Sequence, residues 1–282
     1  MNTRPLDLRR RRARIVNFFF RAILSAFIWD VLIRTFGGRA RAKRTALERY
    51  TRLARQFRAL AVELGGVLIK LGQFAGSRAD ILPKEILDEL ASLQDEVPPE
   101  PFDRIQIVIE RELNHPLTAV FQSIEAQPVA AASLGQAHRV ILNNGERAVV
   151  KVQRPGIEGL VAVDLEALRI AVGWLKRYGP IRRRMDLDAL YDEFSRTLYE
   201  ELDYLAEGRN AEKFAVDFAD WRDIRIPKIH WEMTTRRVLT MEDIGAIKIG
   251  DVAAFTARGV SAHDVAHSLF KFYLQQVFVN GF

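Results

Sequence analysis

A tight turn between two β-branched segments is the sequence feature that most constrains the fold of this chain. The turn is Asn143-Asn144-Gly145, and an Asn-Gly pair between alternating apolar residues is a strong signal of a β-hairpin. We expect the two strands at 138–142 and 147–153, and two further short strands at 225–229 and 238–241. The pattern predicts an α+β fold, in which a small antiparallel sheet is accompanied by many helices.

Helical periodicity covers most of the remaining chain. A helix from about residue 45 to 64 runs into a second helical segment, 61–77, that is apolar and rich in small residues. Pro83 precedes another helix, where its missing N–H is harmless. The other helices are expected at 84–93, 102–113, 157–177, 187–217 and 263–280.

Lys70 and Gln73 are the unusual residues of the segment 61–77. Residues three apart share one face of a helix, so this face would carry a cation and an amide out of an apolar stripe. Such groups are costly to bury unless both find partners. The alternative is a lysine at the edge of a packed helix that extends its charge to solvent.

The predicted helix 187–217 carries three carboxylates close together, Glu201, Asp203 and Glu207. In a continuous helix, positions 200, 203 and 207 share a face and position 201 lies about 100° away. One face therefore cannot present all three groups. The alternative is a solvated, acidic helix surface.

Lys151 lies at the centre of the predicted strand 147–153, on the same strand face as Val149 and Gln153. Upstream, Ala130, Ala131, Ala132 and Ser133 begin a segment of small residues that ends at Gln136. By themselves, these features are typical of a solvent-facing lysine and of a small-residue turn.

Charge is unevenly distributed along the chain. Residues 1–58 contain 16 Lys/Arg and three Asp/Glu, whereas the remainder carries more acidic than basic groups. The basic cluster 9–14 would suit phosphate groups of anionic lipid or nucleic acid. The following segment, 15–33, contains many Phe, Ile and Leu residues but is interrupted by Arg21 and Asp30. It indicates an interfacial helix at a membrane surface rather than a membrane-spanning one; a helix packed on the folded body is the alternative, and a nucleic-acid arm fits the apolar residues poorly.

The chain contains no cysteine, which excludes a disulfide framework, a thiolate metal site and a cysteine nucleophile. Its five histidines are dispersed. We predict no metal site made by protein ligands alone.

The segment LIKLGQFAGSRADILPKEILDELASLQDEVPP, residues 68–99, closely resembles the signature extension of the UbiB-like (AarF-like) atypical kinases. The resemblance continues through the alanine-rich segment, the strand with Lys151 and the Glu-x-Asp motif at 201–203. It implies a protein-kinase-like N-lobe with a helical N-terminal extension and the start of a helical C-lobe. On this basis we expect four segments: a basic, membrane-proximal helical arm at 1–58, the signature extension at 59–118, the N-lobe at 119–245 and the start of the C-lobe at 246–282.

The resemblance also implies residue roles. Lys151 would pair with Glu207 and hold the phosphates of ATP or ADP, and the alanines 130–132 with Ser133 would replace the glycine-rich phosphate loop of ordinary kinases. The segment 240–245 would be the hinge, with the backbone of Glu242 and Ile244 facing adenine and Met241 as gatekeeper. Lys70 and Gln73 would lie over the nucleotide pocket, and Glu201 and Asp203 would meet Lys70 or a metal.

In this family the catalytic aspartate and the Mg²⁺ ligands lie in later motifs, and the chain ends where the first of these would begin. We therefore expect no catalytic residues in 1–282, no turnover of ATP by this chain alone, and Mg²⁺ binding only in a full-length protein. The resemblance implies support of ubiquinone or related prenyl-lipid biosynthesis at the cytoplasmic surface of a membrane, with prenyl-lipids or lipid-biosynthesis enzymes as partners and no nucleic acid. A nucleotide-sensing scaffold without catalysis and an ordinary protein kinase are the alternatives.

Overall fold

The structure, a computed structural model, describes residues 7–33, 35–36, 38–77, 82–94, 97–177, 179 and 185–281, apart from the side chains of Asp30 and Gln94. Two compact units are interleaved along the chain. Unit 1 comprises Met1–Val108, Gln127–Ala137 and Val152–Asp203, and unit 2 comprises Ile109–Ala126, His138–Lys151 and Tyr204–Phe282. Because these units are not contiguous in sequence, they do not coincide with the four segments predicted above, which stay a prediction.

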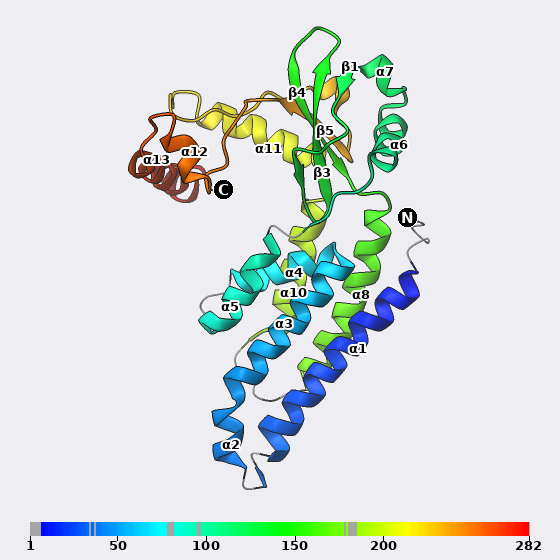
Figure 1. Ribbon diagram of the computed structural model, residues 1–282, viewed down its shortest axis with the longest axis vertical. Coiled ribbons are helices and arrows are strands. Elements are labelled where there is room, and N and C mark those ends of the chain that lie inside the picture. Colours follow the sequence, from blue (N-terminus) through cyan, green and yellow to red (C-terminus); the bar gives the residue numbers. More distant parts are fainter. Residues whose placement is uncertain are drawn as a thin grey trace. The chain divides into compact units, whose positions relative to one another are not determined.

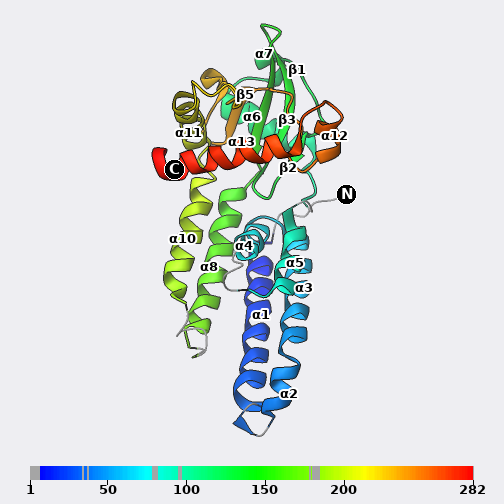
Figure 2. The ribbon, with the colours of Figure 1, turned by 90° about the vertical axis from the view of Figure 1, so that its left-hand side faces the viewer.

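Unit 1 is a bundle of helices (Figures 1 and 2). Its long helix α8 packs against both α1 and α10, and α4 packs against α3, α5, α8 and α10. The elements are α1 (Leu8–Phe27), the π-helix η1 (Ile28–Ile33), α2 (Arg39–Arg44), α3 (Ala46–Leu64), α4 (Val67–Gly76), α5 (Lys84–Ala91), the 3₁₀-helix η2 (Ser92–Gln94), α8 (Ile157–Leu175) and α10 (Leu187–Glu200).

The core of unit 1 is built where α4 and α8 face each other. Val67, Leu68 and Ile69 of α4 are fully buried and belong to one cluster with Val161 and Leu165 of α8. Complete burial of each of these side chains stabilises the fold by roughly 1.5–3 kcal/mol relative to its exposure. The helix that carries Lys70 is thus held by its apolar residues.

Within the described residues, one antiparallel sheet contains five strands, in the order β1-β3-β4-β5 with β2 also paired to β3. The strands are β1 (Phe121–Ile124), β2 (Ala130–Ala131), β3 (Gly135–Leu142), β4 (Arg147–Gln153) and β5 (Val238–Glu242). The hairpin β3–β4 confirms the strongest prediction, and Gly145 has the positive φ of 84° that its turn requires.

The helices outside the bundle are α6 (Phe102–Leu113), α7 (Leu117–Val120), α11 (Tyr204–Asp217), the 3₁₀-helix η3 (Trp231–Met233), α12 (Val252–Thr256), α13 (Ala262–Gln275) and the π-helix η4 (Gln276–Asn280). The predicted helix 102–113 coincides with α6. In unit 2, α11 packs against β5 around a small core of Tyr204, Ile229 and Leu239.

The strand predicted at 225–229 is wrong. Only Ile229 makes an isolated bridge, to Met241, and the rest of this segment has no regular structure. Pro227 has no N–H to donate to a ladder, which disfavours a strand at this place.

The helix predicted at about 45–64 is confirmed as α3, whereas the overlapping helical segment predicted at 61–77 is interrupted at residues 65–66. Gly65 and Gly66 both have positive φ, 66° and 63°, and separate α3 from α4. Glycine populates such conformations at little cost, whereas other residues are strained there. Within the signature segment 68–99, residues 78–81 and 95–96 lie outside the described residues.

The helix predicted from 187 to 217 is also interrupted, at Glu201-Leu202-Asp203 between α10 and α11. The helical-wheel argument for Glu201, Asp203 and Glu207 therefore does not apply. Because the break separates the carboxylates onto different elements, each can face a different partner.

Several arginines of the basic cluster 9–14 have partners within the chain, and the expectation that the cluster binds phosphates stays a prediction. Arg11 is buried and makes two bonds of 2.6 Å to the buried carboxylate of Asp164. Arg12 pairs with Glu166, Arg14 with Glu63, and Arg10 with Asp7. Arg11, Arg12 and Arg14 attach α1 to α8 and to the end of α3.

Candidate functional site

Lys151 and Glu207 form a close ion pair in unit 2. The ammonium of Lys151, at the centre of β4, lies 2.6 and 2.7 Å from the two carboxylate oxygens of Glu207. Both side chains are partly exposed. The pairing that was expected for these two residues, 56 positions apart in the sequence, is thus present.

Tyr204 supports this pair from the first turn of α11. The Lys151 ammonium lies 4.7 Å from the centroid of the Tyr204 ring, within the range of a cation–π interaction. Tyr204 is itself buried, and its backbone N–H donates to the carbonyl of Arg236. Tyr204 was not singled out from the sequence; the available signal was a tyrosine three residues before the pairing glutamate, since both lie on one helix face.

Gly208, the next residue after Glu207, allows a close approach between α11 and Trp231. A Cβ atom on Gly208 would lie 2.8 Å from the indole ring, and the indole N–H donates to Glu212 on the same helix. The rigid indole ring cannot move aside for a Cβ atom as the end of a flexible side chain could. Gly208 and Trp231 therefore set the position of the helix that carries Glu207, and neither was singled out from the sequence.

Lys70 and Glu201 form a second ion pair, in unit 1. The Lys70 ammonium lies 2.7 Å from a carboxylate oxygen of Glu201, which directly follows α10. Gln73, one turn later on α4, donates its side-chain amide to the carbonyl of Leu93 at 3.4 Å. Both polar groups of α4 therefore have partners, as the cost of burying them requires.

Gln153 holds the turn that contains Glu201 and Asp203. Its buried side-chain amide donates to the carbonyl of Leu202 at 2.6 Å. The turn is completed by backbone hydrogen bonds from Leu202 and Asp203 to the carbonyls of Tyr199 and Glu200. Gln153 is a positioning residue that the sequence placed on the strand but to which it assigned no role.

We expected the alanine-rich segment to be a single loop, but both of its ends are strands. Ala130 and Ala131 form β2, and the turn itself is Ala132-Ser133-Leu134, closed by the Ala132 N–H on the carbonyl of Gly135 at 2.8 Å. Three residues suffice to join the paired strands, so the alanines extend the sheet.

This turn is also held firmly in place. Ser133 and Leu134 are buried, and Arg154 donates from its side chain to the carbonyl of Ala132 and from its backbone to that of Leu134. A glycine-rich loop is free to approach phosphates closely, whereas this turn lacks that freedom.

The predicted hinge follows β5. Glu242 donates its backbone N–H to the carbonyl of Lys228, so only its backbone carbonyl is left to accept a hydrogen bond from adenine. Its side chain pairs with Arg225. Ile244 is partly exposed, and Met241 packs on the core of unit 2. Asp243, which the sequence analysis did not single out, binds Arg139 and Arg147 and accepts the N–H of Gly245.

The pair of Lys151 and Glu207 is suited to binding a phosphate group of a nucleotide. An ammonium has three N–H donors, and Glu207 takes two of them, which leaves one for an oxygen atom of a phosphate. Glu207 fixes the rotamer of a long side chain that would otherwise lose entropy when it binds a ligand. Among the residues that the structure describes, no group of three His, Cys, Asp or Glu side chains could hold a metal ion.

The sequence of this chain is similar to those of several known proteins. The chain is similar to the uncharacterized protein sll0095 of Synechocystis (40% identity over 96% of this chain and 47% of that protein). It is also similar to the chloroplastic protein ACTIVITY OF BC1 COMPLEX KINASE 7 of Arabidopsis thaliana (37%, over 87% of this chain and 35% of that protein) and to the probable protein kinase UbiB of Marinobacter nauticus (36%, over 78% and 40%). The chain thus spans less than half the length of these relatives.

A solved complex of Rv3197 with erythromycin from Mycobacterium tuberculosis matches with a TM-score of 0.48 and 28% identity, over 75% of this chain and 53% of that one. The profile of the ABC1 atypical kinase-like domain matches residues 92–282, which include both strands of the hairpin, Lys151, Glu201 and Glu207. The chain therefore belongs to the ABC1 atypical kinase-like family and has its kinase-like fold.

Proposed function

We propose that this chain is part of an atypical kinase or ATPase-like protein that binds ATP or ADP and supports ubiquinone or related prenyl-lipid biosynthesis at a membrane surface. The observation that carries the proposal is the ion pair between Lys151 on β4 and Glu207 on α11. A strand lysine paired with a helix glutamate is the arrangement by which kinases hold the α- and β-phosphates of the nucleotide.

The names of two relatives agree with this proposal, since both contain the word kinase and one of them is UbiB. In the proposed arrangement the third N–H of Lys151 binds a phosphate oxygen, and the carbonyl of Glu242 and the backbone of Ile244 serve adenine. Mg²⁺ would be bound with the nucleotide in the full-length protein.

Lys70 and Gln73 have a distinct role in the proposal. Together with Glu201 and Asp203 they would cover the nucleotide, at the place where a peptide substrate binds in ordinary protein kinases. This role favours a small lipid-like substrate. The pair of Lys70 and Glu201 supports the proposal because it links the signature helix α4 to the turn that precedes α11.

The proposed membrane contact rests on the outer face of α1 and η1. Phe20, Leu24, Phe27, Ile28 and Leu32 lie along one side of this helical segment, and all are substantially exposed. By length and composition, the helical segment Leu8–Ile33 could cross a membrane. Since Arg11 and Ile15 on its inner face are buried in the bundle, we favour a helix that lies on the membrane surface.

The second candidate is a scaffold that senses a nucleotide without catalysis. The observation that favours it is the alanine turn, whose fixed backbone and buried Ser133 differ from a mobile glycine-rich loop. Such a turn would bind the nucleotide without the loop closure that orders phosphates for transfer.

The test is nucleotide binding, measured by calorimetry with ATP and with ADP, with and without Mg²⁺, on a full-length version of the protein. A charged hydrogen bond contributes about 1.5–3 kcal/mol, so Lys151→Ala should weaken binding roughly tenfold to hundredfold. Lys176→Ala is the matched control, because Lys176 also pairs with a carboxylate, that of Asp188, on the exposed surface of unit 1. Equal nucleotide affinities of the Lys151→Ala and wild-type proteins would refute the proposed site.

The same preparation separates the two candidates. Phosphate release that depends on Lys151 supports the kinase or ATPase, whereas binding without turnover supports the scaffold. Ala131→Gly tests the role of the alanine segment, since it should increase turnover only if the fixed backbone limits catalysis.

A further inference from the structure

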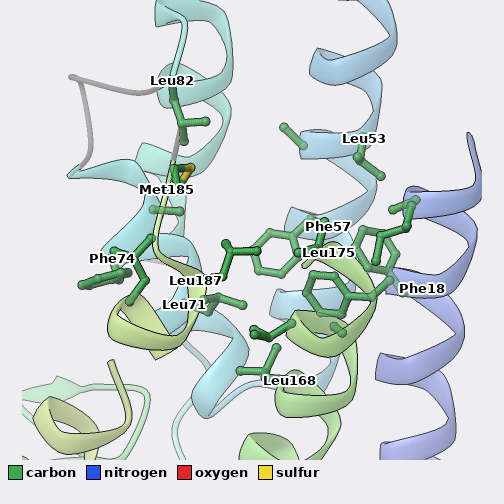
Figure 3. A pocket seen from close by; sticks show the side chains of 18 of the residues that line it. Phe18, Leu53, Phe57, Leu71, Phe74, Leu82, Leu168, Leu175, Met185 and Leu187 are labelled. Carbon is green, nitrogen blue, oxygen red and sulfur yellow. The ribbon is translucent and has the colours of Figure 1, made fainter. Parts of the chain in front are cut away.

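A large apolar cavity lies inside the helical bundle of unit 1. Its volume is about 490 Å³, within the range of about 300–1,000 Å³ that is usual for small-molecule sites. Figure 3 shows side chains from several helices converging on it, among them Phe18, Phe57, Leu71, Phe74 and Leu168. The walls come from α1, α3, α4, α5, α8 and α10.

The walls offer almost nothing to a polar ligand. None of the described residues that line the cavity carries a charge, and most are aliphatic or phenylalanine. Tyr191 is one of two tyrosines in the wall, and its hydroxyl donates to the carbonyl of Leu165. A charged or strongly hydrogen-bonding group would therefore lose its hydration in this cavity without gaining partners.

Apolar walls of this extent are unfavourable in contact with water, whereas an apolar chain that fills the cavity gains packing contacts with them. We propose that this cavity binds the hydrocarbon tail of a lipid, a single prenyl or acyl chain, with the polar end of that lipid outside. The proposal concerns a site separate from Lys151 and does not depend on nucleotide binding.

The two helices of the Lys70–Glu201 pair both contribute walls. Leu71 and Phe74 of α4 directly follow Lys70 and Gln73 in the sequence. Phe194 of α10 lies on the helix that Glu201 terminates, and its ring centroid is 5.5 Å from that of Phe74. A bound tail would contact both helices at once and would thereby stabilise the geometry of the ion pair.

The binding test uses the chain 1–282 and two probes, cis-parinaric acid for an acyl tail and geranylgeraniol as a competitor for a prenyl tail. We expect saturable binding of one cis-parinaric acid per chain, detected by its fluorescence, or, if the site prefers prenyl chains, saturable binding of geranylgeraniol by calorimetry. Displacement of one probe by the other identifies a common site, and the ratio of their affinities identifies the preferred chain.

Filling the cavity locates the site. Ala171 on α8 lies in the wall and is buried, so Ala171→Trp should lower the affinity at least tenfold. Ala162→Trp, at an exposed position of the same helix, should leave it unchanged. If Ala171→Trp does not fold, as judged by circular dichroism and thermal melting, the milder Ala22→Leu with Ala75→Leu fills the same space from α1 and α4.

Hydrogen exchange tests the link to the ion pair. Probe binding should slow exchange of the backbone amides of α4 and α10 severalfold, and the Lys70→Ala variant should bind the probe but show less protection near Glu201. No saturable binding of either probe, or equal affinity in a folded cavity-filling variant, would overturn the proposed site. Protection confined to α1 would overturn the link to Lys70.

Discussion

Arg11 is the residue on which the arrangement of the N-terminal helix depends most. Its guanidinium is bound on one side by the carboxylate of Asp164 and on the other by the carbonyls of Leu64 and Gly65, at 2.5 and 3.0 Å. It therefore satisfies carbonyl groups at the end of α3 that have no helical partner. Arg11 thus joins α1, α3 and α8, directly before the glycine pair that leads to α4.

Removing Arg11 should strongly destabilise unit 1. The Arg11→Ala variant leaves Asp164 buried without its cation, which typically costs about 3–5 kcal/mol of unfolding free energy. Arg12→Ala is the matched control: Arg12 pairs with Glu166 at the surface, so its loss should cost less than about 1 kcal/mol. Urea unfolding followed by circular dichroism measures both, and similar losses in the two variants would contradict the assigned role.

The loss of unfolding free energy in the Arg11→Ala variant should also depend on pH. Burial raises the pKa of Asp164 above its ordinary value of 3.8, and the bonds from Arg11 oppose this shift. Without Arg11 the pKa in the folded state rises further, so the folded variant binds a proton that the unfolded chain does not. The stability deficit of Arg11→Ala should therefore shrink as the pH falls from the folded-state pKa of Asp164 in the variant to that in the wild type, which itself lies above 3.8. A deficit that grows over this window would contradict the explanation.

At the scale of elements, two short interruptions place the carboxylates and the signature lysine. The Gly65–Gly66 turn ends α3 and starts α4, and the turn at 201–203 separates Glu201 from Glu207. Because Glu201 lies outside the helix that carries Glu207, one glutamate can meet Lys70 and the other Lys151. Packing of α4 then fixes the position of the lysine.

Gly72 should be essential for that packing, whereas Gly76 on the same helix should not. A Cβ atom on Gly72 would lie 2.2 Å from a methyl group of Leu93 and 3.2 Å from the Phe57 ring, and Leu93 is fully buried. Gly72→Ala should therefore cost about 1–3 kcal/mol through overpacking.

Gly76 is the matched control for this substitution. A Cβ atom there would meet Leu90 at 3.5 Å, an ordinary contact, and alanine favours the helix by about 0.5–1 kcal/mol. Thermal melting of the two variants should move in opposite directions. A Gly72→Ala variant as stable as Gly76→Ala would show that α4 can shift freely.

At the scale of the whole molecule, α13 presents an apolar surface. Its inner residue Phe272 packs on Phe218, with ring centroids 4.6 Å apart, while Phe270 and Tyr273 are more than half exposed. The following residues Val277 and Phe278 are exposed as well. Contiguous apolar surface of this kind promotes association between molecules.

The chain 1–282 should therefore self-associate, and charges on α13 should suppress this. The double substitution Phe270→Lys with Tyr273→Lys should lower the weight-average mass measured by light scattering at a given concentration. His263→Lys with Ala266→Lys adds lysines to exposed positions of the same helix and should have little effect. An equal decrease in weight-average mass in both variants would show that added charge alone suppresses the association, and that the apolar face is not its cause.

Local pattern and family resemblance together identified much of the candidate site. The Asn-Gly turn predicted the hairpin because turn type depends on adjacent residues, and the strand with Lys151 follows from it. The pairings of Lys151 with Glu207 and of Lys70 with Glu201 came from the resemblance to a family, since no local pattern relates residues 56 or 131 positions apart. Their roles toward a nucleotide stay a prediction.

The sequence by itself determined most of the helices and the two strands of the hairpin, because periodicity and turn residues act within a few positions, but it was wrong about a strand at 225–229. It also carried the family motifs. Tertiary structure alone decided that Arg11 of the basic cluster is buried against Asp164, 153 residues away, and where the predicted helix 187–217 breaks. It likewise created the apolar cavity, which belongs to no single segment: six helices each contribute a few apolar residues that would look like ordinary core positions in any one of them.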